Sequence, residues 1–165
     1  MTITMNHTGF VVENVERSLQ FYRDVLGLDH AGSYEEVGTA RIVGYDQPHL
    51  KGALLVASDG HYLELIEYVK PRGEIRSSEE QHKRAVVGAS HLAFIVDDAE
   101  DMLERLVNNG GSKFKPVVEL QPGVKACYLQ DPDGNWIELL QDEDHSAQQF
   151  EIRQNTRIFR SFGVK

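Results

Sequence analysis

An internal repeat constrains the fold of this chain more than any other feature. Residues 7–21 (HTGFVVENVERSLQF) match residues 91–105 (HLAFIVDDAEDMLER) at an offset of 84 positions. Residues 63–65 (LEL) match residues 137–139 (IEL) at an offset of 74, so the first copy holds ten extra residues. A repeat of this kind indicates one supersecondary unit that is built twice. We predict a module at 1–68, a linker at 69–90, a second module at 91–141 and a tail at 142–165.

Each copy has the pattern of a β-α-β-β-β unit. Residues 7–12 and 91–96 alternate between apolar and small or polar side chains, as a strand does. Asn14 and Asp98 follow at the N-cap position of a helix, before apolar residues recur at helical spacing. Three strand-like segments complete each copy, at about 32–45, 52–58 and 61–68, and at 112–119, 124–130 and 135–141. The predicted fold class is α+β, with two β-α-β-β-β modules whose curled mixed sheets form a cup.

Composition narrows the class of partner. The chain of 165 residues carries 17 basic and 26 acidic residues, a net charge of −9. Nucleic acid and anionic membrane surfaces attract basic proteins, so we expect neither as a partner. No apolar run is long enough to span a bilayer and no signal peptide is visible. Cys127 is the single cysteine, which excludes an intrachain disulfide. We expect a cytoplasmic protein that acts on a small molecule.

Strand alternation predicts which side chains share a face of the first module. His7 shares a face with Gly9, while Phe10 belongs to the opposite, helix-covered face. Glu64 shares a face with Tyr62, because the two are separated by one residue of the same strand. The sequence therefore predicts a histidine and a glutamate on one concave face, beside the space that a glycine leaves.

The second module repeats this pattern. His91 corresponds to His7, Glu138 corresponds to Glu64, and Trp136 takes the place of Tyr62. Two imidazoles and two carboxylates suit a divalent ion such as Zn, Ni, Co, Mn or Fe(II). We predict a metal site made of His7, Glu64, His91 and Glu138, with Tyr62 and Trp136 as walls of the substrate pocket.

Other polar residues fit this site less well. Glu67 has the opposite parity to Glu64 and corresponds to Gln141, so we expect a solvated or pairing role. His61 has the wrong parity and corresponds to a hairpin residue, and Cys127 suits a small core position. Three histidines fall in predicted turn, linker and tail segments, where surface positions are expected: His30, His82 and His145.

The tail retains apolar residues that suggest docking on the body or a second subunit: Phe150, Ile152, Ile158, Phe159 and Phe162.

Two motifs carry a resemblance to a known family. FYRDVLGL at 21–28 and DPDGNWIEL at 131–139 resemble the vicinal oxygen chelate superfamily, which includes glyoxalase I, methylmalonyl-CoA epimerase, extradiol dioxygenases and antibiotic-resistance proteins. The resemblance covers about residues 5–141. It implies the paired-module fold, a divalent metal cofactor and, because modules of this superfamily often pair across chains, a homodimer.

The ligand pattern favours one branch of that superfamily. Glyoxalase I and the epimerases carry His, Glu or Gln, His and Glu on these strands, which maps onto all four predicted ligands. Extradiol dioxygenases use two histidines and one glutamate, and antibiotic-sequestering members generally lack the set. Methylmalonyl-CoA epimerases also carry a glutamate that is thought to be a base, where this chain has His49. That departure leaves His49 as a candidate base or a surface loop residue.

The resemblance and the ligand set together predict a lyase or isomerase. A metal-stabilised enolate would form when Glu138 or Glu64 moves the proton next to a substrate carbonyl, as in an epimerase, an isomerase or a glyoxalase-type lyase. One alternative is an Fe(II)-dependent ring-cleaving or other dioxygenase. A second alternative is an antibiotic-binding resistance protein that has no catalytic activity.

Overall fold

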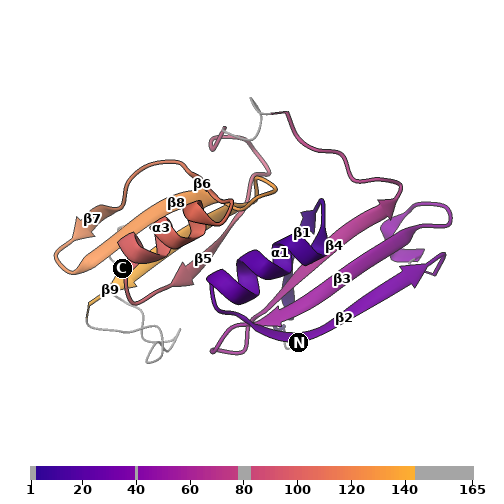
Figure 1. Cartoon of the computed structure of the whole chain (residues 1–165), viewed down its shortest axis with the longest axis horizontal. Helices are drawn as coiled ribbons and strands as arrows, with labels where there is room; N and C mark the ends of the chain where they lie inside the picture. Colours follow the sequence, from indigo (N-terminus) through magenta and orange to yellow (C-terminus); the bar gives the residue numbers. More distant parts are fainter. Residues whose placement is uncertain (1–2, 40, 78–82, 144–165) are drawn as a thin grey trace. The chain divides into compact units, whose positions relative to one another are not determined.

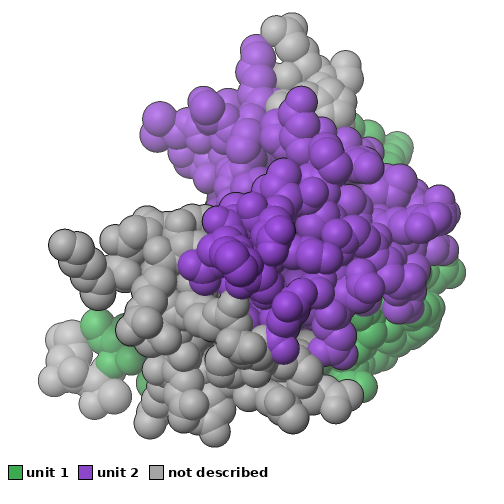
Figure 2. All heavy atoms as spheres, turned by 90° about the vertical axis from the view of Figure 1, so that its left-hand side faces the viewer, with its two compact units in different colours: residues 1–77 green, residues 78–165 purple. Residues whose placement is uncertain are grey.

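The computed structural model describes residues 3–39, 41–77 and 83–143. The apolar tail residues from which docking was predicted lie outside these ranges, as do His82 and His145. The chain divides into two compact units, Met1–Ser77 and Ser78–Lys165, which are coloured separately in Figure 2. Each unit contains one copy of the sequence repeat and is described by itself.

The first unit is a four-stranded sheet with a helix against it (Figure 1). Strands in the sheet lie in the order β1-β4-β3-β2; β1 and β4 are parallel, and the other neighbours are antiparallel. In chain order its elements are β1 (His7–Val12), α1 (Val15–Leu19), a π-helix (Gln20–Val25), β2 (Asp29–Val37), a 3₁₀ turn (Arg41–Val43), β3 (His49–Val56) and β4 (Tyr62–Lys70).

The second unit has the same topology. Its sheet has the order β5-β9-β8-β6, with β5 parallel to β9, and β7 also pairs with β8. In chain order its elements are β5 (His91–Ile95), α3 (Ala99–Asn108), β6 (Ser112–Lys113), β7 (Val118–Gln121), β8 (Val124–Gln130) and β9 (Trp136–Asp142). The predicted fold class, α+β with two mixed sheets, is confirmed.

Both helices begin at the predicted N-cap residues. Asn14 Oδ1 accepts a hydrogen bond from the backbone N–H of Arg17, and Asp98 Oδ1 accepts one from that of Asp101. Each cap satisfies one of the backbone donors that a helix N-terminus leaves without an intrahelical acceptor.

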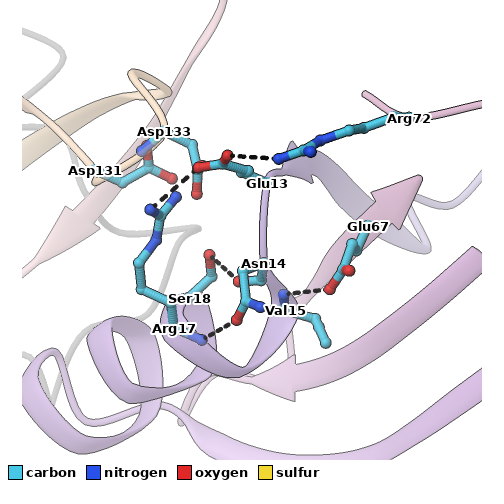
Figure 3. A network of polar contacts seen from close by, with 9 residues as sticks. All are labelled: Glu13, Asn14, Val15, Arg17, Ser18, Glu67, Arg72, Asp131 and Asp133. Carbon is cyan, nitrogen blue, oxygen red and sulfur yellow. Dashed lines mark hydrogen bonds and ion pairs between the residues drawn. The ribbon is translucent and has the colours of Figure 1, made fainter. Parts of the chain in front are cut away.

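A second acceptor at each helix start comes from the last strand of the unit. Glu67 Oε2 accepts from the N–H of Val15 at 2.9 Å, as Figure 3 shows, and Gln141 Oε1 accepts from the N–H of Ala99 at the same distance. We expected Glu67 to be either solvated or paired, and the structure shows it paired with a backbone N–H. The repeat conserves this function with two different side chains, because an amide oxygen accepts a backbone N–H as a carboxylate does.

The core of each unit lies between the sheet and its helix. Leu63 and Leu65 of β4 are almost fully buried, as are Ile137 and Leu139 of β9. Burial of each such side chain contributes roughly 1.5–3 kcal/mol. Because side chains alternate along a strand, burial of these four residues against the helices directs Glu64 and Glu138 to the opposite face of each sheet.

Two predicted strands are shorter than the sequence pattern indicated. The strand predicted at 32–45 begins at Asp29 but ends at Val37, because Gly38 has φ 71° and its N–H turns to the carbonyl of Pro48. The prediction was wrong beyond that point. The strand predicted at 112–119 is divided into β6 and β7 around Pro116, which has no N–H to give to a ladder.

Candidate functional site

A histidine and a glutamate face each other in the first unit. Gly9 of β1 lies opposite Glu64 of β4, and His7 lies opposite Tyr62. Glu64 Oε2 is 3.2 Å from His7 Nε2. A Cβ on Gly9 would lie 3.8 Å from that carboxylate oxygen, so the glycine leaves open space beside the pair. The strand register therefore creates the pair that alternation predicted for this face.

Tyr34 of β2 holds the other oxygen of Glu64. The Tyr34 hydroxyl donates a 2.8 Å hydrogen bond to Glu64 Oε1. Burial, and then this hydrogen bond, raise the pKa of Tyr34 far above its usual value, so the hydroxyl stays a donor at neutral pH. The tyrosine ring lies over Gly52 of β3, where a Cβ would come within 2.1 Å of it. Gly52 is thus required for Tyr34 to reach Glu64.

The second unit repeats the pair in a more enclosed setting. Ala93 of β5 lies opposite Glu138 of β9, and Glu138 Oε2 is 3.0 Å from His91 Nε2. The Glu138 side chain is 8% exposed, whereas that of Glu64 is 19% exposed. Water therefore has less access to the second carboxylate.

Aromatic rings surround the second pair. Trp136 is almost fully buried, and the rings of Phe114 and Tyr128 pack edge-on against it at centroid distances of 5.1 and 6.5 Å. Tyr128 also meets His91 edge-on at 5.2 Å. Burial raises the pKa of Tyr128. Tyr62, at the position equivalent to Trp136, is 41% exposed.

Arg84 lies against this aromatic group. Its guanidinium carbon is 4.8 Å from the ring centroid of Tyr128 and 5.5 Å from that of Trp136. Its Nη2 donates to Nδ1 of His91. Arg84 belongs to the linker predicted at 69–90, and the structure places it beside a predicted metal ligand.

His49 is not brought to this site. Its Nε2 is 2.7 Å from Glu35 Oε1. Glu35 neighbours Tyr34 in β2 and so points to the opposite face from the residue that binds Glu64. The predicted base therefore has a surface carboxylate as its partner.

The remaining residues that sequence reasoning set aside lie away from the two pairs. His61 binds Asp59 within the β3–β4 hairpin, with its Nδ1 2.9 Å from Oδ2. His30 lies in β2 rather than in a turn, and its Nε2 is 2.9 Å from the Ser33 hydroxyl. Cys127 is buried in β8, and burial raises the pKa of its thiol to about 11, which disfavours the reactive thiolate.

Sequence reasoning missed Tyr34, Tyr128 and Arg84. Tyr128 had a usable signal, because it lies opposite Glu138 in the β8–β9 hairpin and shares its face. Tyr34 and Arg84 had none, since neither has an equivalent in the other copy of the repeat. Among residues 3–39, 41–77 and 83–143, no three His, Cys, Asp or Glu side chains form a cluster that could hold a metal ion. Each unit supplies one histidine and one glutamate of the predicted ligand set.

Comparison with known proteins identifies the family. The model of the Glyoxalase/Bleomycin resistance protein/Dioxygenase superfamily matches residues 4–139. The chain belongs to this superfamily. The match includes both His–Glu pairs and ends before the tail, as the predicted resemblance did.

The relatives within this superfamily differ in activity. A lactoylglutathione lyase of Neisseria meningitidis serogroup A is 30% identical over 140 residues, which cover 82% of this chain and 88% of the relative. A lactoylglutathione lyase of Escherichia coli O157:H7 is 25% identical, covering 84% and 92%. A catechol-2,3-dioxygenase of Bacillus subtilis is 29% identical, with 87% of this chain but only 44% of the relative covered.

Solved structures agree on the fold. A glyoxalase family protein from Bacillus cereus has a TM-score of 0.76 at 23% identity. The match covers 86% of this chain and 96% of the Bacillus cereus chain. Glyoxalase I from Zea mays has a TM-score of 0.61 at 20% identity, covering 86% and 45%. Within the described residues, no helix has the length and apolar character needed to cross a membrane.

Proposed function

We propose that this protein is a divalent-metal-dependent enzyme that transfers a proton next to a substrate carbonyl, as an epimerase, an isomerase or a glyoxalase-type lyase does. The observation that carries the proposal is the repeated His–Glu pair, with its nitrogen–oxygen distances of 3.2 and 3.0 Å. The metal ligands that we propose are the four residues predicted from the sequence: His7, Glu64, His91 and Glu138.

The paired atoms fit a metal ion chemically and geometrically. Neutral imidazole nitrogen and carboxylate oxygen are preferred ligands of first-row divalent metals. Metal–ligand bonds of about 2.1 Å at tetrahedral to octahedral angles put neighbouring ligand atoms about 3.0–3.4 Å apart. Both His–Glu distances fall within that interval.

The residues have separate roles in the proposed reaction. A bound divalent ion would supply Lewis acidity that stabilises negative charge on the substrate oxygen. Glu138, the more enclosed carboxylate, would move the proton, because exclusion of water favours transfer between fixed groups. Tyr34 would keep Glu64 in place as a ligand. Tyr62 and Trp136 would form the apolar walls around the substrate.

Metal content is the measurement that tests this proposal. Protein purified without added chelator should hold one divalent ion per chain by elemental analysis. Glu64→Gln and Glu138→Gln should each lower the occupancy of this ion. Two ions per chain, each lost in only one variant, would show two separate sites, and retention of metal in both variants would contradict the assignment.

Oxygen chemistry is the second candidate function, because catechol-2,3-dioxygenase and two biphenyl-2,3-diol 1,2-dioxygenases are among the relatives. An Fe(II) dioxygenase would consume O₂ with a catechol and lose activity when its iron is oxidised by air. A metal-loaded protein that exchanges a substrate α-proton without O₂ uptake would support the proton-transfer assignment.

Family resemblance also leads us to propose a homodimer, for which light scattering should give twice the 18.6 kDa chain mass.

A further inference from the structure

We propose that Arg84 is the binding site for a carboxylate group of the substrate. This inference rests on the proposed function, because it assigns a substrate class to that site: small carbonyl compounds that also carry a carboxylate. The linker residue is placed beside His91, so the carboxylate would lie next to the reacting part of the molecule.

The guanidinium of Arg84 is held in a defined position. Tyr128 and Trp136 lie nearly perpendicular to each other, with an interplanar angle of 87°, and both contact the guanidinium by cation–π geometry. Contact with two differently oriented rings restricts the movement of the group. A guanidinium that is fixed in this way offers its N–H fork to a ligand at a low cost in side-chain entropy.

The donors of Arg84 are incompletely used. Its Nε is buried and has no hydrogen-bond partner in the part of the chain that the structure describes. Nor does any carboxylate in that part form an ion pair with Arg84, in a chain with 26 acidic residues. Arg84 as a whole is half-buried, but its Nε is not in contact with water, and an unmade hydrogen bond of a buried donor costs roughly 1–3 kcal/mol. A planar carboxylate that accepts two parallel N–H bonds would remove this cost.

The contact with His91 indicates how Nη2 becomes available. Arginine can only donate, so Nδ1 of His91 must accept and the single proton of the neutral imidazole lies on Nε2, facing Glu138. A substrate carboxylate can replace this imidazole as the acceptor for Nη2, because a hydrogen bond between two charged groups is stronger than one to a neutral ring nitrogen.

Trp136 allows the inference to be tested without an activity assay. It is the single tryptophan of the chain, and its ring contacts Arg84, so its fluorescence reports on occupancy beside the guanidinium. The full-length protein, both as purified and after removal of metal by chelation, would be titrated with pyruvate, with the neutral analogue pyruvamide and with inorganic phosphate. The metal-free titration separates this inference from the proposed function, because it measures Arg84 alone.

Pyruvate should change the fluorescence saturably in the wild-type protein, and pyruvamide should bind roughly 10–100-fold more weakly, as expected for loss of a charge-assisted bidentate contact. Arg84→Gln should weaken pyruvate binding by a similar factor. Arg84→Lys, which keeps the charge but not the fork, should be intermediate. The matched control is Arg72→Gln, at a side chain that is 82% exposed in the other unit, and it should bind like wild type.

Several results would overturn the inference. Equal affinity for pyruvate and pyruvamide in the wild-type protein would do so, and that comparison needs no variant to fold. Unchanged pyruvate binding in Arg84→Gln, or binding of phosphate without binding of pyruvate, would do so as well. Pyruvate binding through Arg84 in a protein that never takes up metal would support this inference and contradict the proposed function.

Discussion

Tyr34 and Glu64 form a hydrogen bond of 2.8 Å that uses one carboxylate oxygen and leaves the other 3.2 Å from His7. The two residues are 30 positions apart and lie on β2 and β4, with β3 between them. Tyr34 crosses β3 above Gly52, the residue whose missing side chain makes the crossing possible. This arrangement orients Glu64 Oε2 toward the histidine before any ligand binds.

Removal of the Tyr34 hydroxyl should weaken metal binding without unfolding the protein. Tyr34→Phe keeps the ring over Gly52 but leaves Glu64 Oε1 without its donor, so the carboxylate rotates more freely. Loss of such an outer contact typically lowers metal affinity about 10–100-fold. Competition with a chelating dye measures the affinity. Tyr45→Phe, at a half-exposed tyrosine whose ring meets that of Tyr68 edge-on, is the control and should retain wild-type affinity.

A side chain at position 52 should displace Tyr34. Gly52→Ala puts a Cβ where the tyrosine ring lies, so the ring must move and Glu64 loses its partner. Overpacking of this kind costs roughly 1–3 kcal/mol of unfolding free energy, and metal affinity should fall as in Tyr34→Phe. Urea unfolding and the dye competition measure the two effects. Gly32→Ala, where no atom lies within 4 Å of the new Cβ, should show neither effect.

Substitution of Glu67 should lower the stability of the protein without changing its metal affinity, in contrast to substitution of Glu64. Glu67→Ala removes the acceptor for the N–H of Val15 at the start of α1, which should lower the free energy of unfolding by about 1–2 kcal/mol. Metal affinity should be unchanged, because Glu67 lies on the helix-facing side of β4. Glu67→Gln keeps an acceptor, as Gln141 does in the second unit, and should be nearly as stable as wild type. A loss of metal in Glu67→Ala would contradict the face assignment.

Cys127 should make the protein less stable at alkaline pH. Burial raises the pKa of its thiol from 9.0 to about 11, so the unfolded chain loses this proton at lower pH than the folded chain does. The free energy of unfolding should therefore fall as pH rises from about 9 to about 11, on account of this group. Cys127→Ala should show a shallower decline over that interval in urea titrations at successive pH values. Parallel curves for the two proteins would show that the thiol does not contribute.

Glu138 should be needed for proton transfer but not for folding. Glu138→Gln keeps the size of the side chain and removes its basicity, so the substrate α-proton should no longer exchange with D₂O at a measurable rate. Proton NMR follows the exchange, and circular dichroism confirms the fold. Because this residue is also a proposed ligand, exchange is compared at metal concentrations that restore full occupancy. Undiminished exchange at full occupancy would exclude Glu138 as the base.

The internal repeat made most of the fold predictable. Each helix start, the hairpins and the parity of β4 and β9 could be read from one copy and checked in the other. The errors occurred where the copies differ or where a local residue overrides periodicity, as at Gly38 and Pro116. Glu67 illustrates the limit: parity placed it on the other face from Glu64, but only the position of α1 revealed its acceptor role.

Strand alternation and the internal repeat together selected His7, Glu64, His91 and Glu138 from many polar residues. A side-chain period of two assigns every residue of a strand to one face, and the repeat shows the same residue types at matching positions of both copies. The tertiary structure decided what surrounds them. Tyr34 reaches Glu64 across a glycine of another strand, and Arg84 reaches His91 from a linker with no periodic pattern. Contacts of this kind depend on side-chain length, open space and the path of a loop, and none of these leaves a periodic signal in the sequence.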